Sequence, residues 1–239
     1  SAAGAIGSAG AERIPMSRIR AEHPRLLVGE EEFQSLKRNA ATPEGRALAE
    51  RIIHDAESLL EVPPQERRME GRRLLMASRT VLFRVTTLCV AEKLTNSRKY
   101  ADRAIREMVT AAEYSDWNPS HFLDVGEMTL ALAIGCDWLY DAMTPEQREL
   151  VQRAIVEKGL KPSFQGKQWW VTGDNNWNPV CHAGMVAGAL CVADLEPELA
   201  EKTVARAVEN LPRSMKASYF PNGTYPEGPM YWSYGTEFT

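Results

Sequence analysis

The sequence lacks a long apolar run, and it lacks an excess of positive charge. No stretch reaches the about eighteen consecutive apolar residues that a transmembrane helix needs, so we expect no segment to span a membrane. Lys and Arg number 28 against 32 Asp and Glu, which gives a formal net charge of −4. Because nucleic-acid binding depends on a cationic face, this balance disfavours a nucleic-acid partner. The length of 239 residues suffices to bury a substantial core.

Cysteine and histidine are scarce, with four of each, and neither forms a metal-binding pattern. No two cysteines make a CxxC pair, the histidines are scattered, and no Asp-rich loop suggests calcium, so we expect no metal or other cofactor. We expect the cysteines to be small buried hydrophobic residues, which leaves the redox compartment open. They are Cys89, Cys136, Cys181 and Cys191.

Strand-like alternation of apolar and polar residues is also missing, whereas helical periodicity recurs along the chain, so we predict an all-α fold. The segment 121–142 is apolar on nearly every side, which indicates burial on most sides. Thr144 and Gln147 have the spacing of a capping box at a helix start. The predicted helices are 30–39, 43–60, 66–94, 96–112, 121–142, 145–159, 179–193 and 195–211.

The helices are long and joined by short connections, which favours antiparallel pairs. This pattern suits a toroid or solenoid of helical hairpins better than a small four-helix bundle. No repeat of fixed period occurs, so the standard repeat families lack support. We therefore expect an incomplete (α/α) toroid over residues 23–239, after a flexible tail at 1–22. The small residues that open the tail resemble the region of a signal-peptide cleavage site, which predicts a periplasmic or secreted protein.

Two predicted loops hold aromatic and amide residues that a core does not need. In a toroid, loops at one end converge around a central cleft, where aromatic faces and amide groups suit a sugar ring and its hydroxyls. The first loop and the helix after it hold Trp169, Trp170, Asn175, Asn176, Trp177, Asn178 and His182, and the second loop holds Tyr225, Glu227, Tyr231, Trp232 and Tyr234.

Asparagine is a poor residue for a helix interior, yet three asparagines stand at the start of an apolar helix. A helix cap accounts for one or two of them, and we expect another to hold the loop.

The motifs NNWNPVCHAGMVAGAL and NGTYPEGPMYWSYG, about forty residues apart, resemble those of the heparinase II/III-like polysaccharide lyases. HFLDVGEMTLALAIGCDWLYD and HPRLLV resemble the helical domain of the same group, and the likeness covers most of the chain from residue 23. The resemblance implies an (α/α) toroid that cleaves a uronic-acid polysaccharide by β-elimination, so that the expected partner is an acidic polysaccharide.

The resemblance also implies roles for individual residues. Asn176 would bind and neutralise the uronate carboxylate, and a tyrosine would act as base, acid or both. That tyrosine is Tyr234 or Tyr231, with Tyr234 favoured, and His182 is a further catalytic candidate. The remaining candidates, all for substrate binding, are Asn175, Asn178, Trp170, Trp177, Glu227, Trp232 and His121.

These residue types fit the chemistry of an elimination. The proton next to a carboxylate becomes acidic only once that charge is neutralised, which an amide donor achieves without titrating. Ionising a tyrosine at pH 7 costs roughly 4 kcal/mol, so we expect a nearby cation or hydrogen-bond donor to lower the pKa of the tyrosine. His182, Lys167 and Arg213 are the candidates for it.

The chain departs from the family pattern at two places. It has Trp177 where some members have a histidine after the two asparagines. Family members also continue into a β-sandwich domain that often contributes a catalytic histidine. We expect this chain to be truncated relative to the family, either as a fragment or because that domain has been lost.

Two other functions remain open. Asp124 and Glu127 are three residues apart on one helix face, and paired carboxylates could serve a glycoside hydrolase with an α/α barrel. A non-catalytic helical scaffold could also bind sugars through the same aromatic residues without turnover.

Overall fold

The computed structural model describes residues 18–239, and every regular element in that range is a helix, which confirms the all-α prediction. The predicted tail at 1–22 lies mostly outside the described residues. The α-helices are α1 (Glu30–Ala40), α2 (Pro43–Leu59), α3 (Leu75–Thr95), α4 (Arg98–Ala112), α5 (Phe122–Trp138), α6 (Pro145–Ala154), α7 (Trp177–Cys191), α8 (Pro197–Ser218) and α9 (Pro229–Glu237).

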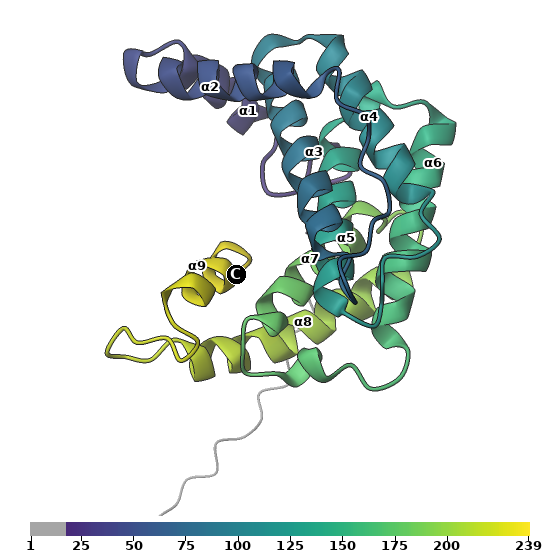
Figure 1. The fold of residues 1–239 in the computed structure, drawn as a ribbon, viewed down its shortest axis with the longest axis vertical. Helices are drawn as coiled ribbons and strands as arrows, with labels where there is room; N and C mark the ends of the chain where they lie inside the picture. Colours follow the sequence, from purple (N-terminus) through teal and green to yellow (C-terminus); the bar gives the residue numbers. More distant parts are fainter. Residues whose placement is uncertain (1–17) are drawn as a thin grey trace, which may run out of the picture.

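The helices follow one another around an open arc (Figure 1). Helix α2 stands at the top of that view, α3 to α6 form its right side, and α7 and α8 form its lower part. Helix α9 turns back into the opening of the arc. The last helix of the chain therefore lies on the inner side, where it can meet side chains from helices far away in the sequence.

Helix α5 is the centre of the core and packs against both α3 and α7. Almost every residue from Phe122 to Asp137 is buried, as the apolar pattern predicted. Its crossing with α7 is close because two glycines meet there. A Cβ atom at Gly184 would lie 2.0 Å from the carbonyl oxygen of Gly126. The two backbones are thus in direct contact, and only glycine fits at position 184.

The HPRLLV segment is anchored to the end of α5 by Asp137, which is fully buried. One oxygen of its carboxylate lies 2.5 Å from Nδ1 of His23. The other accepts the backbone N–H groups of Arg25 and Leu26, both at 2.8 Å. This motif therefore has a structural role: it fixes the start of the described chain against the core.

Two helix starts agree with their sequence signals. The Thr144 hydroxyl accepts the Gln147 backbone N–H at 3.3 Å, and the Gln147 side chain accepts the Thr144 N–H at 3.0 Å. Thr42 caps α2 by accepting from the backbone nitrogen of Gly45 at 3.1 Å. Both caps precede a proline at the first helical position. The four cysteines are free and buried, which also agrees with the prediction.

The predicted helix 66–94 is wrong at its start, because α3 begins only at Leu75. Buried carboxylates bind the backbone of the preceding segment and take the place of helical hydrogen bonds. Glu107 accepts from the Gln65 nitrogen at 2.8 Å, and Asp124 accepts from the Leu74 nitrogen at 2.6 Å. Asn96 was predicted to start the next helix but ends α3 instead, in the left-handed conformation with φ 54°.

The second predicted loop contains a helix that the sequence analysis missed. Residues 229–237 form α9, with Pro229 at its first position. Tyr231 and Tyr234 are therefore three residues apart on a helix and share one face of it. Other predicted bounds also shift: α7 starts two residues earlier than predicted, and α8 continues through Pro212 to Ser218. As α-helices, α5 ends at Trp138 and α6 at Ala154, both earlier than predicted.

Candidate functional site

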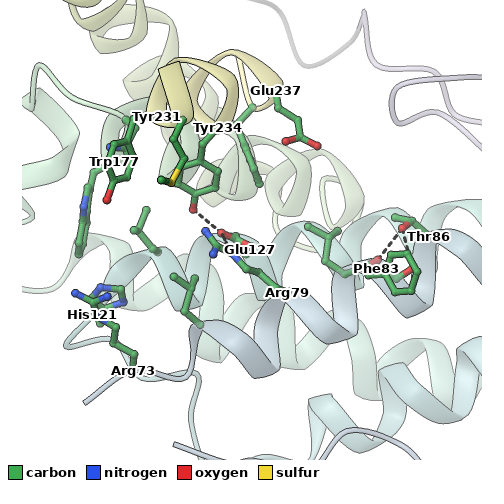
Figure 2. A pocket seen from close by; sticks show the side chains of 16 residues that line it. Arg73, Arg79, Phe83, Thr86, His121, Glu127, Trp177, Tyr231, Tyr234 and Glu237 are labelled. Atoms are coloured by element: carbon green, nitrogen blue, oxygen red, sulfur yellow. Dashed lines mark hydrogen bonds and ion pairs between the residues drawn. The ribbon is translucent and has the colours of Figure 1, made fainter. Parts of the chain in front are cut away.

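A cavity of about 650 Å³ opens between α3, α5, the start of α7 and α9. Five of the residues predicted for the site line it, namely His121, Asn176, Trp177, Tyr231 and Tyr234. Figure 2 shows Tyr234 reaching from α9 towards Glu127 and Arg79, while His121, Trp177 and Tyr231 stand to one side. The residues with functional side chains are Arg73, Arg79, His121, Glu127, Asn176, Trp177, Tyr231, Tyr234 and Glu237.

The Tyr234 hydroxyl donates a hydrogen bond to Oε1 of Glu127, and Arg79 holds the same carboxylate. The Arg79 Nε lies 3.2 and 3.3 Å from the two Glu127 oxygens, and its guanidinium carbon lies 4.9 Å from the centre of the Tyr234 ring. A phenol from α9, a carboxylate from α5 and a guanidinium from α3 thus form one cluster in the cavity.

Burial, and then the negative charge of Glu127, raise the pKa of Tyr234. The positive charge of Arg79 acts in the opposite direction but does not outweigh them. Burial also raises the pKa of Glu127, against the hydrogen bond from Tyr234 and the charge of Arg79. A nearby cation does lower the pKa of the tyrosine, as expected, but burial and Glu127 make the net shift upward. In this state Tyr234 is a protonated donor at neutral pH.

The predicted cations lie elsewhere. His182 and Lys167 do not line the cavity within the described part of the chain, and Arg213 instead pairs with Asp174 at 3.5 Å. Arg79 takes the place that those three residues were expected to fill.

His121 is held by Asp124, whose Oδ1 lies 2.6 Å from its Nδ1. When Nδ1 carries the proton and donates it to the carboxylate, Nε2 keeps a lone pair and can act as a base. The other oxygen of Asp124 accepts the Leu74 N–H at 2.6 Å and the Asn118 amide at 2.7 Å. Since Asp124 is fully buried and both its oxygens are used, it positions His121 and is not free to react with a sugar.

The three asparagines make three different sets of contacts. The Asn175 side chain accepts the Trp177 backbone N–H at 3.1 Å and so supports the start of α7. The Asn178 amide donates to the carbonyl oxygens of Trp170 and Val171, at 3.2 and 2.8 Å, and holds the loop. Asn176 stands at the cap position of α7, but its side chain makes no capping hydrogen bond.

Asn176 binds a carboxylate, namely that of Glu227. Its backbone nitrogen donates to one Glu227 oxygen at 2.8 Å, and its Nδ2 donates to the other at 2.7 Å. The Tyr225 hydroxyl adds a longer contact of 3.4 Å to the first oxygen. Glu227 was predicted to bind substrate, whereas the structure gives it this intramolecular partner.

Trp170 and His182 were expected at the cleft, but the structure places both in the core, each about 1% exposed. Trp170 stacks on Phe122, with ring centres 5.0 Å apart, and meets the His182 ring edge-on. The His182 Nε2 lies 3.3 Å from the carbonyl oxygen of Val171, and the residue borders a different, apolar hollow. A direct catalytic contact of His182 with Tyr234 has no support in this geometry.

Burial lowers the pKa of His182 to about 4 from its ordinary value of 6.5. Between pH 6.5 and about 4, the unfolded chain therefore binds a proton at His182 that the folded chain does not bind. The stability that the neutral, buried His182 provides is lost as the pH falls through this range. The loss amounts to roughly 3 kcal/mol. We expect His182→Gln to flatten this part of the pH dependence. Urea denaturation at a series of pH values would test it, and parallel curves for the two proteins would contradict it.

An aromatic wall leads out of the cavity. The Trp177 ring lies 4.8 Å from the ring of His121 on one side and 4.8 Å from that of Trp169 on the other. Trp169 is about half exposed, so the wall continues to the surface. Tyr231 lines the cavity beside Trp177 (Figure 2). Trp232 also lies on α9 but is not among the described residues that line the cavity.

Arg79 and Arg73 line the cavity, and the sequence analysis did not single them out. A signal for Arg79 was present in the helical spacing. Leu75, Arg79, Leu82, Phe83 and Thr86 recur three or four residues apart and line the cavity together, on a face separate from the buried one. This second set of helically spaced residues, on a helix whose other face is buried in the core, therefore indicated a second contact surface.

A scan against protein-family models and a search of curated proteins find no match to this chain. Within residues 18–239, no helix is long and apolar enough to cross a membrane. The same residues contain no group of three or more His, Cys, Asp or Glu side chains that could hold a metal ion.

Proposed function

We propose that this protein is a polysaccharide lyase that cleaves a uronic-acid polysaccharide by β-elimination, and that the arc of helices is part of an (α/α) toroid. One observation carries the proposal: Asn176 at the start of α7 and Tyr234 on α9 line the same cavity. A lyase of this kind needs an amide donor and a tyrosine at one cleft. Helix α9, which turns back into the arc, provides that meeting (Figure 1).

The reaction needs a base for the proton next to the uronate carboxylate. His121 suits this role, because Asp124 binds its Nδ1 and leaves Nε2 available at the cavity. As Nε2 takes the proton, the electrons of the C–H bond form the new carbon–carbon double bond, and the bond to the glycosidic oxygen breaks. The Asn176 donors neutralise the carboxylate during this step.

The departing glycosidic oxygen needs a proton, and Tyr234 suits the role of acid. Burial and Glu127 keep its hydroxyl protonated at neutral pH. In the free protein this proton points to Glu127, so the hydroxyl must turn towards the substrate before it reacts. Arg79 remains paired with Glu127. Its positive charge offsets the negative charge that Tyr234 acquires when it gives up the proton.

The glycosidase alternative is less well supported. It requires two carboxylates that can reach a sugar, whereas Asp124 is fully buried and its oxygens bind Leu74, Asn118 and His121. Of that pair only Glu127 lines the cavity. Glu237 lines it as well, but the Glu127 carboxylate is already bound by Arg79 and Tyr234.

Mass spectrometry of the products separates the candidate functions. Elimination gives fragments whose summed mass equals that of the starting chain, with an unsaturated uronate at the new end. Hydrolysis adds one water for each cut, and a binding scaffold gives no product. Unsaturated fragments from wild type, and none from Asn176→Ala, would support the lyase. Saturated fragments, or a chain left intact on every uronic-acid polymer, would exclude it.

Trp177 is expected to provide a stacking face for a sugar ring beside the reacting bond. We expect Trp177→Ala to raise KM about tenfold, since the lost apolar contact is worth roughly 1–2 kcal/mol, with a smaller change in kcat. Trp232→Ala is the matched control, because Trp232 is about half exposed on α9 and does not line the cavity. Steady-state kinetics decide the point, and equal KM values for the two variants would contradict the stacking role.

A further inference from the structure

The contact between Asn176 and Glu227 has the form of a carboxylate-binding site that is already filled. Two N–H donors of one residue reach the two oxygens of one carboxylate, at 2.8 and 2.7 Å. Asn176 stands at the start of α7, where the helix dipole favours negative charge. It is only about 3% exposed, so these donors are covered while Glu227 stays in place.

The bond to Glu227 is of a kind that another carboxylate can replace. The partners of Glu227 in the described chain are the neutral donors of Asn176 and Tyr225, and no ion pair with Glu227 occurs there. Exchange with a second carboxylate would therefore preserve both the charge at the donors and the number of hydrogen bonds. Only differences in fit and in the motion of the chain would decide which carboxylate is bound.

Asn176 also has an unused acceptor. Its Oδ1 is buried and has no hydrogen-bond partner among residues 18–239. Glu227 does not satisfy it, because both of its oxygens accept hydrogen bonds from the Asn176 donors. A uronic acid carries hydroxyl donors near its carboxylate, so it could fill the two donors and the acceptor together. A buried acceptor without a partner is costly, which makes a ligand of this kind the better match.

Glu227 lies on the connection between α8 and α9, not within a helix. The connection turns at Gly223 and Gly228, which have positive φ values of 82° and 86°. Nearby, the Tyr219 hydroxyl and the Thr236 hydroxyl are 2.8 Å apart, which ties the connection to α9. Release of Glu227 thus involves its side chain and this connection, and leaves the hydrogen bonds within α7 intact.

We propose that Glu227 closes the carboxylate site at Asn176 in the free protein until substrate displaces it. The identity of the ligand rests on the proposed function, whereas the closure rests on the contacts of Glu227 alone. If the site is open in a tenth of the molecules or fewer, apparent affinity for a free carboxylate falls about tenfold or more.

Calorimetric titration with sodium D-glucuronate tests this closure without turnover. We expect Glu227→Ala to bind glucuronate about tenfold more tightly than wild type does. The double variant Asn176→Ala with Glu227→Ala should lose that gain, and D-glucose should bind to neither. Glu237→Ala is the matched control, since it removes one negative charge from the same cavity but leaves the Glu227 contact intact. Its gain should be clearly smaller.

Glu227→Gln guards against a variant that fails to fold. It keeps the size of the side chain and loses the charge, so it should bind glucuronate with an affinity between those of wild type and Glu227→Ala. Circular dichroism shows which variants are folded. If the folded variants bind glucuronate no better than wild type, or no better than Glu237→Ala, Glu227 positions Asn176 and does not close a site, and the inference is overturned.

The outcomes also separate this inference from the proposed function. Elimination by wild type without any gain in binding from the Glu227 variants would overturn the closure and leave the lyase intact. A gain in binding that requires Asn176, together with no elimination by any variant, would support the carboxylate site and remove the lyase.

Discussion

Tyr234→Phe is expected to lower the rate of elimination about a thousandfold, or roughly 4 kcal/mol in activation free energy, because it removes the proposed proton donor. KM should change little, since the ring remains beside Arg79. The hydroxyl also donates to the buried Glu127 carboxylate, so the free energy of unfolding should fall by about 1–2 kcal/mol. Initial rates and urea denaturation measure the two effects separately.

Tyr231→Phe is the matched control for Tyr234. It alters a tyrosine on the same face of α9 and at the same cavity, but Tyr231 is about half exposed. We expect its rate to stay within about tenfold of wild type, which is less than general acid catalysis contributes. If Tyr231→Phe abolishes elimination and Tyr234→Phe does not, the roles of the two tyrosines are exchanged and the cluster with Glu127 is structural.

Gly184→Ala should have the largest effect on stability. The new Cβ would lie 2.0 Å from the Gly126 carbonyl oxygen and 2.8 Å from its Cα, so the backbones of α5 and α7 would have to move apart. Helices at the centre of the core cannot separate without loss of packing around them. We expect the free energy of unfolding to fall by about 3 kcal/mol or more, or the protein to be recovered only in aggregated form.

Two variants calibrate that result. Ala187→Ser lies on the same helix at a half-buried position and should cost about 0.5 kcal/mol through helix propensity. At Gly126 the nearest contact of an added Cβ is 3.2 Å, to the Cα of Cys181, so Gly126→Ala should fall between the two. Denaturation midpoints that are equal for Gly184→Ala and Ala187→Ser would contradict the close crossing.

Local signals in the sequence predicted much of the fold. The capping box at Thr144 and Gln147 identified a helix start because its interacting groups are only three residues apart. The apolar character of α5 on all sides predicted its burial, since such a helix has no face suited to water. The predicted start of α3 was wrong because the hydrogen bonds that hold residues 65–74 come from Glu107 and Asp124, which are distant in the sequence.

The candidate site was predicted in part, and its failures have the same cause. Residue type singled out Asn176, Trp177, Tyr231 and Tyr234, which do line one cavity. Residue type could not show that Trp170 and His182 face the core, because periodicity defines the faces of a helix but not the neighbour of each face. Arg79 meets partners 48 and 155 positions away, at Glu127 and Tyr234, and no local pattern encodes such a contact.

The most direct test of the account is the near-ultraviolet absorbance of wild-type reactions on a panel of uronic-acid polysaccharides, each compared with its carboxyl-reduced form. The account predicts that absorbance rises on at least one uronate polymer and stays flat on the same polymer after reduction, because the carboxylate both acidifies the proton and binds Asn176. Equal release of fragments from the two forms, without any rise in absorbance, would contradict it.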